Sequence, residues 1–141
     1  MSAFNNATKF FHACEGLKGP SGTAHYVAEG AGFECQAQAL TGIETVQDYA
    51  GWLAGLGTTA LAGARYRLDS SAWDAESNCA LFFSTFIAAH TGDGGPVAPT
   101  GKETNSHYVY VIKMNDAGKV AHVTKIWNSS WALRELGWAK S

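Results

Sequence analysis

The chain has 141 residues and a formal net charge of −2, a length typical of one domain with a substantial core. Hydrophobic residues make up 46% of the chain, which excludes a disordered protein, and the near-neutral charge argues against a basic nucleic-acid-binding surface. Charged residues reach only 16% while aromatic residues reach 12%, against roughly 25% charged residues in an average soluble domain. The composition therefore predicts an internal apolar cavity, an oligomer interface, or both.

The N-terminal half is predicted to contain a helix, two short segments and a second helix, at residues 2–17, 24–29, 33–39 and about 41–56. Apolar residues at helical spacing support both helices. Thr41 and Glu44 have the three-residue spacing of a capping box, so the second helix is expected to begin there.

The C-terminal half is predicted to contain four strands and a short terminal helix, at residues 64–73, 79–90, 103–114, 119–127 and 130–136. The strand segments are rich in β-branched and aromatic residues, and a tight-turn signal over 115–118 joins the last two into a hairpin. This order of elements predicts a single α+β domain over residues 1–141, with helices on one face of a curved antiparallel sheet.

The three cysteines, Cys14, Cys35 and Cys79, are too widely spaced for a redox motif or a zinc site. Reduced, mostly buried thiols are expected, as in a cytoplasmic protein. No apolar run is long enough to span a membrane, and the N-terminus lacks the order of a signal peptide. Neither a metal-ligand pattern nor a nucleotide-binding motif is found, so no cofactor is expected.

Two histidines of the predicted hairpin are the candidates for chemistry. If Met114 opposes Lys119, then His107 and His122 point to the same face, about 13 Å apart along the ladder. A histidine can give or take a proton near neutral pH. The competing interpretation is a structural histidine that is hydrogen-bonded within its strand.

Three stretches of the sequence resemble a known family. They are Ala39–Glu44, the pair His90–Gly92 and Pro96–Lys102, and the C-terminal set Gly118–Val120, Ile126–Asn128 and Ala132–Gly137. Together they are similar to motifs of the SnoaL-like polyketide cyclases, within the nuclear transport factor 2-like superfamily. The resemblance implies a cone of helices on a strongly curved sheet, a homodimer, and a closed-ended hydrophobic pocket.

The resemblance also implies site residues. The position of the cyclases' acid–base carboxylate corresponds to His122, and a second polar position corresponds to His107. Asn105 and Thr124 share their face and are expected to orient a substrate. The opposite face of the hairpin is expected to form the dimer interface through the side chains of Tyr108, Tyr110 and Trp127.

The pocket wall in this family is formed by the second helix and the segment before it, which points to Tyr26, Phe33 and Trp52. The expected function is binding of a small, largely hydrophobic molecule, with cofactor-free cyclase- or isomerase-type chemistry. Because a histidine replaces the family's carboxylate at position 122, the alternative is a ligand-binding or protein-interaction module without catalysis. No nucleic-acid or membrane partner is expected.

Overall fold

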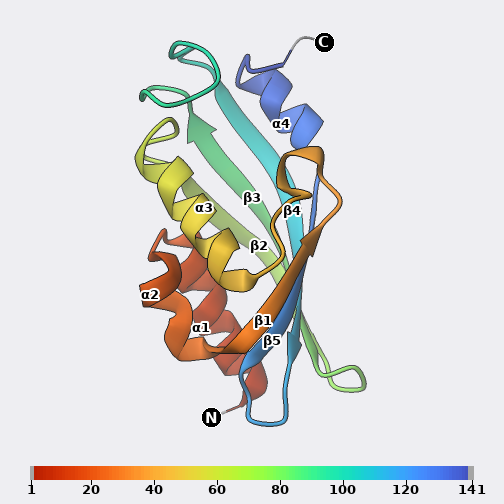
Figure 1. The fold of residues 1–141 in the computed structure, drawn as a ribbon. Coiled ribbons are helices and arrows are strands. Elements are labelled where there is room, and N and C mark those ends of the chain that lie inside the picture. Colours follow the sequence, from red (N-terminus) through yellow and green to blue (C-terminus); the bar gives the residue numbers. More distant parts are fainter. Residues whose placement is uncertain (1, 140–141) are drawn as a thin grey trace.

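A computed structural model describes residues 2–139, in which helices lie against one face of a bent, five-stranded sheet (Figure 1). The helices are α1 (Ala3–Glu15), α2 (Gly19–Thr23), α3 (Val46–Thr58) and α4 (Ser129–Glu135), with 3₁₀ turns at Ala24–Tyr26 and Gln38–Leu40. The strands are β1 (Val27–Cys35), β2 (Arg65–Asp74), β3 (Cys79–Ala89), β4 (Glu103–Met114) and β5 (Val120–Trp127). The predicted α+β fold is confirmed.

The strand order is β1-β5-β4-β3-β2. Strands β2 to β5 are antiparallel, as predicted, but β1 joins the edge of the sheet parallel to β5. The sheet is therefore mixed rather than wholly antiparallel. Strands joined by a short turn must pair antiparallel. Strands β1 and β5 are far apart in sequence, so this constraint does not apply to them.

The first helix begins at Ser2, whose hydroxyl accepts a hydrogen bond from the backbone N–H of Asn5. Its apolar side chains recur at helical spacing and are buried against the sheet, where the ring of Phe11 stacks on that of Phe82 at 4.7 Å between centroids. Within residues 2–139, no helix combines the length and the apolar character needed to cross a membrane.

The second long helix, α3, begins at Val46, five residues after the predicted start at about residue 41. Its N-cap is Thr45, whose hydroxyl accepts the backbone N–H of Asp48 at 3.1 Å. The predicted capping box is wrong, because Thr41 ends a 3₁₀ turn and the carbonyl of Glu44 accepts the N–H of Phe33 at 2.8 Å. This backbone bond holds the segment before the helix against β1.

The β4–β5 hairpin forms with a register shifted from the predicted one. Asn115 closes a longer turn by bonding to Lys119, and a bulge follows, so that Lys113 rather than Val111 opposes His122. The shift amounts to two residues beyond the bulge. Since side chains alternate with a period of two, His107 and His122 still share one face, as predicted.

The assignment of the two hairpin faces is the main correction to the sequence-based prediction. Tyr108 and Tyr110 are 2% and 0% exposed and lie beneath the helices, whereas Ile126 on the opposite face is 60% exposed. The face of the two histidines is therefore the outer face of the sheet. The alternation of side chains along a strand shows that the hairpin has two faces. It does not show which face is covered, because the covering helices are far away in sequence.

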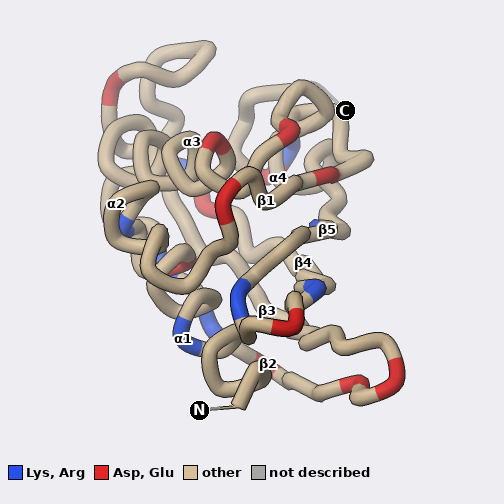
Figure 2. The backbone as a smooth tube through the Cα atoms, turned by 60° about the horizontal axis from the view of Figure 1, so that its bottom comes forward, with Lys and Arg blue, Asp and Glu red and all other residues tan. Residues whose placement is uncertain are grey.

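Charged residues are thinly scattered along the chain, and long stretches of backbone carry none (Figure 2). Most of the large buried side chains form one cluster between α1, α3 and the sheet, and a smaller cluster lies near α4. The inner face of the sheet is thus an aromatic surface shared between helices from both ends of the chain.

We predict that Thr45→Ala lowers the free energy of unfolding by about 1 kcal/mol, because it removes the N-cap of α3. Thr41→Ala is the matched control: its hydroxyl bonds only to the Gln38 carbonyl, at 3.3 Å on the surface, and a smaller loss is expected. Urea denaturation followed by circular dichroism measures both. Equal losses would contradict the assigned helix start.

Candidate functional site

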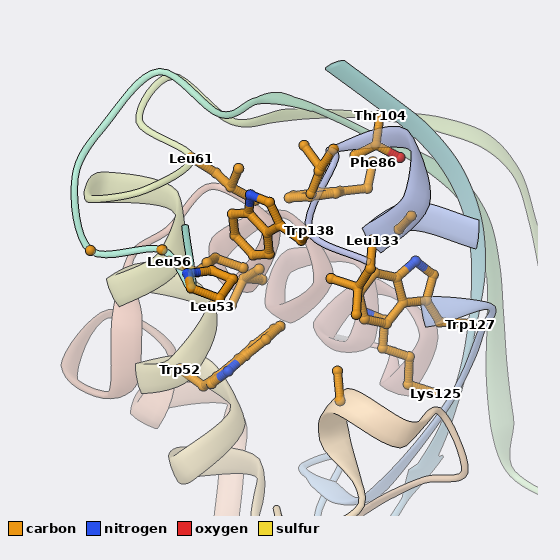
Figure 3. Close-up of a pocket in the computed structure, with 16 residues that line it drawn as sticks. Trp52, Leu53, Leu56, Leu61, Phe86, Thr104, Lys125, Trp127, Leu133 and Trp138 are labelled. Carbon is orange, nitrogen blue, oxygen red and sulfur yellow. The ribbon is translucent and has the colours of Figure 1, made fainter. Parts of the chain in front are cut away.

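A cavity of about 320 Å³ lies between α3, α4 and the inner face of the sheet. Its walls are mainly apolar and include Trp52, Leu53, Leu56, Leu61, Phe86, Trp127, Leu133 and Trp138. In Figure 3, Trp52 and Trp127 lie on opposite sides of the space, and Lys125 lies next to Trp127. Among the described residues that line the cavity, Lys125 is the only one with an ionisable side chain.

Lys125 is 6% exposed although it carries an amine. Its Nζ lies 4.6 Å from the ring centroid of Trp127, and 5.0 and 5.1 Å from those of Tyr108 and Tyr49, within the range of cation–π attraction. Nζ also donates a hydrogen bond to the hydroxyl of Tyr49 at 2.9 Å. Burial lowers the pKa of Lys125, and the negative charge of Glu15 opposes that change.

Glu15, the last residue of α1, is 5% exposed. Its carboxyl group accepts hydrogen bonds from the hydroxyls of Tyr108 and Tyr110, the latter at 2.6 Å. Burial raises the pKa of Glu15, while Lys125 and the two tyrosine hydroxyls act in the opposite direction. A buried carboxyl group with these donors is satisfied in its ionised form.

These side chains form one continuous hydrogen-bonded series, which we call the Glu15–Lys125 chain: Lys125 to Tyr49, Tyr49 to Tyr110, and Tyr110 to Glu15. Burial and the nearby Glu15 charge raise the pKa values of Tyr49 and Tyr110 well above their usual range. Both tyrosines therefore stay neutral, and each hydroxyl can accept one proton and donate another.

Lys125 and Trp127 also border an open groove at the surface, formed by residues 34–38 at the end of β1 and 128–130 at the start of α4. The buried amine thus lies between the cavity and the surface groove. This position gives a small molecule a short route from the surface to the lysine.

The predicted site residues on the hairpin do not line the cavity. His122 and Thr124 lie on the outer face, where both side chains contact Oε1 of Glu34 at 3.1 Å. Asn105 bonds to Glu103, and the ring of His107 lies 5.3 Å from that of Phe83. These residues lie on the face of the sheet that the helices leave uncovered, so they do not line the cavity beneath the helices. Asn105 and His107 instead border a separate pocket of about 230 Å³, and Thr124 borders the surface groove.

The two histidines are also far from each other. His107 pairs with Thr85 and His122 with Lys113, six residues further along β4, which is about 20 Å at the usual strand rise. Glu34 is surface-exposed, and its hydrogen bond to His122 lowers the pKa of the Glu34 carboxyl group. This arrangement is an exposed polar cluster rather than a histidine pair around a ligand.

Of the three predicted wall residues, Trp52 lines the cavity. Phe33 instead stacks on Tyr49, with ring centroids 4.3 Å apart, and supports the Glu15–Lys125 chain from behind. Tyr26 lies in the 3₁₀ turn before β1, where its carbonyl accepts from Asn6, away from the cavity. Neither Phe33 nor Tyr26 is among the lining residues.

His90 is completely buried and directly follows β3. Its Nδ1 accepts hydrogen bonds from Nε1 of Trp138 at 2.7 Å and from the backbone N–H of Thr100 at 3.3 Å. The histidine therefore fixes the indole of Trp138 in the cavity wall. No group of three His, Cys, Asp or Glu side chains within residues 2–139 is arranged to hold a metal ion.

Sequence reasoning named neither Glu15 nor Lys125 among the site residues. Two signals were available. Glu15 follows Phe11 by four residues, which places a carboxylate on the apolar side of the first helix. Lys125 alternates with Val123 and Trp127, so a charge sits within the large apolar side chains of a strand.

No protein-family model and no curated protein sequence matches the chain significantly. Solved structures match over nearly its whole length. IdmH of Streptomyces antibioticus, described as a candidate polyketide cyclase, has a TM-score of 0.77 at 11% identity and covers 97% of this chain and 99% of its own. The chain has a nuclear transport factor 2-like fold.

Two further neighbours support the same fold. A candidate SnoaL-like polyketide cyclase of Jannaschia has a TM-score of 0.76 at 13% identity, covering 99% of this chain and 93% of its own. The pinacolase BvnE of Penicillium brevicompactum has a TM-score of 0.70 at 11% identity, covering 94% and 86%. The fold expected from the sequence resemblance is thereby confirmed.

We predict that Glu15 and Lys125 are energetically coupled. Glu15→Gln should lower the free energy of unfolding by about 3 kcal/mol, because it leaves a buried amine without its counter-charge. In the double variant Glu15→Gln/Lys125→Met, the loss should be smaller than the sum of the two single losses by at least about 1 kcal/mol. Chemical denaturation measures all three.

The exposed pair Arg67 and Asp69, whose Nε and Oδ1 atoms are 2.7 Å apart, provides the control cycle. Arg67→Met and Asp69→Asn should couple by less than about 1 kcal/mol, because solvent screens surface ion pairs. Additive losses at Glu15 and Lys125 would show that the two buried groups stabilise the fold independently.

Proposed function

We propose that this protein binds a small, largely apolar molecule in the cavity and acts on it by cofactor-free acid–base chemistry of the cyclase or isomerase type. The observation that carries the proposal is the position of Lys125, whose amine borders a tryptophan-lined cavity with mostly apolar walls among the described residues. Pockets that combine apolar walls with a few well-placed polar groups are typical of small-molecule sites.

The chemistry follows from the surroundings of the amine. A lysine held in a low-dielectric site can stabilise an oxygen on which negative charge develops, and the Tyr49 hydroxyl lies within hydrogen-bond distance of it. Neighbouring structures described as cyclases and a pinacolase are consistent with reactions on organic frameworks. The proton-transfer roles of His107 and His122 stay predictions, and they are not part of this proposal.

The alternative is ligand binding without catalysis. The internal satisfaction of the Glu15–Lys125 chain favours it, since each member already has a partner. Turnover of a bound compound, lost on Lys125→Met, would distinguish the enzyme from the binding module.

We predict that 2-naphthol, an apolar bicyclic compound with one hydroxyl, binds in the cavity. Leu133→Trp should weaken binding at least tenfold, because the half-buried Leu133 lines the cavity and a larger side chain fills it. Isothermal titration calorimetry measures the affinity. The same change on the outer face, Leu81→Trp, should leave it unaltered; equal affinities in all three proteins would place binding elsewhere.

We also propose that the chain forms a homodimer through the outer face of the sheet, but through other residues than predicted. Phe83, Val109 and Ile126 lie side by side across β3, β4 and β5, and Leu81 and Val111 form the next row. We call these five residues the outer-face patch. Phe83 and Ile126 are 40% and 60% exposed, and a contiguous apolar patch marks an interaction surface.

Phe83→Glu is expected to convert the dimer to a monomer, because it places a charge in the middle of the outer-face patch. Gln47→Glu, an exposed position on α3 remote from this face, should leave the mass unchanged. Sedimentation equilibrium at micromolar concentration measures both. A monomeric mass for the unmodified protein would refute the dimer.

A further inference from the structure

The Glu15–Lys125 chain joins a buried carboxylate to the one amine among the described residues that line the cavity. Acid–base chemistry in the cavity requires only the lysine and the Tyr49 hydroxyl beside it. The remaining members of the Glu15–Lys125 chain, Tyr110 on β4 and Glu15 at the end of α1, do not line the cavity. A buried carboxyl group is unfavourable unless its partners compensate for lost hydration, so its position needs a reason.

The direction of the hydrogen bonds gives a reason for the buried position of Glu15. The amine donates to Tyr49, and the hydroxyls of Tyr49 and Tyr110 can pass a proton on to Oε2 of Glu15. When each hydroxyl accepts one proton and releases another, Glu15 becomes protonated and Lys125 becomes a neutral amine. Burial brings this neutral pair closer in free energy to the ion pair, because it lowers the pKa of Lys125 and raises that of Glu15.

Other titratable groups face the same amine. Cys14 on α1 and Cys35 on β1 interact with its charge, as Glu15 does. Burial raises the pKa of Cys14 well above its usual range, so this thiol stays protonated. The hydrogen-bonded chain ends at Glu15, which makes that carboxylate the proton acceptor.

We propose that Lys125 is a nucleophile that forms an imine with an aldehyde or ketone bound in the cavity. This inference rests on the proposed function, since it uses the same cavity, and it names the class of substrate. A neutral, desolvated lysine is the form that attacks carbonyl groups. The apolar aromatic walls favour a carbonyl attached to a flat hydrocarbon framework.

The reaction balances without a cofactor. Nζ of Lys125 forms a bond to the carbonyl carbon while the carbonyl oxygen takes a proton, giving a carbinolamine. The carbon–oxygen bond then breaks, and the oxygen leaves with two hydrogens that came from the amine, as one water molecule. A C=N bond replaces the C=O bond, and no electrons are exchanged with another reagent.

The surroundings of Nζ also suit the product. The proton held by Glu15 can return through Tyr110 and Tyr49 to the imine nitrogen. The nitrogen then carries a positive charge and lies over the ring of Trp127 and near those of Tyr49 and Tyr108. The aromatic faces attract such a cation. The groove formed by residues 34–38 and 128–130 gives the released water a route to solvent.

The test uses 2-naphthaldehyde with sodium cyanoborohydride, which reduces an imine to a stable secondary amine. Peptide mapping by mass spectrometry should find Lys125 modified at least tenfold faster than the exposed lysines Lys9, Lys18, Lys102 and Lys113. Lys125→Arg keeps the charge but should give no adduct at this position. Tyr49→Phe keeps the ring but interrupts the chain, and should slow labelling of Lys125 about tenfold.

An excess of 2-naphthol, which fills the cavity but has no carbonyl group, should protect Lys125 of the unmodified protein. This protection experiment uses the unmodified protein, so its result does not depend on whether a substituted protein folds. If 2-naphthol binds while Lys125 reacts no faster than the surface lysines, the imine is refuted and the proposed function stands. If 2-naphthol does not bind and Lys125 is not selectively labelled, both fail.

Discussion

Burial of two opposite charges inside an aromatic core is the constraint on which the inner face of this protein depends. Glu15 and Lys125 come from elements 110 residues apart in sequence, and neither can be removed from water cheaply on its own. Tyrosine hydroxyls connect them, and aromatic rings enclose the amine. Helix α1, helix α3 and strands β4 and β5 must therefore all be in place before either charge is satisfied.

The same constraint explains the unusual composition. A chain with few charged residues places two of them on the inner face, and the aromatic residues that surround them fill the space beneath the helices. This aromatic layer continues into the cavity between α3, α4 and the sheet, and Lys125 lies at the boundary between the two. The Glu15–Lys125 chain and the cavity are thus contiguous, because they share Lys125.

The outer face of the sheet differs from the inner face in its distribution of polar side chains. Its centre is apolar across three strands, while polar side chains such as His122 and Thr124 contact Glu34 at its edge. Sequence reasoning correctly predicted that each strand of the hairpin has two distinct faces, because side chains alternate along a strand. It exchanged the faces, since apolar and amphipathic side chains occur on both, and only the packing of α1 and α3 distinguishes inside from outside.

The sequence by itself determined helices α1 and α4, strands β2 to β5 and the α+β fold, because apolar periodicity, glycines and turn residues act over short distances. It divided the residues of β1 between two short segments, 24–29 and 33–39. It also predicted that the histidines share a face, since the two-residue period survives the shift in register. Only the tertiary structure decided the start of α3, where a backbone bond from Phe33 competes with helix formation. It alone brought Glu15 to Lys125, because the energy of a buried charge depends on partners supplied by distant segments of the chain.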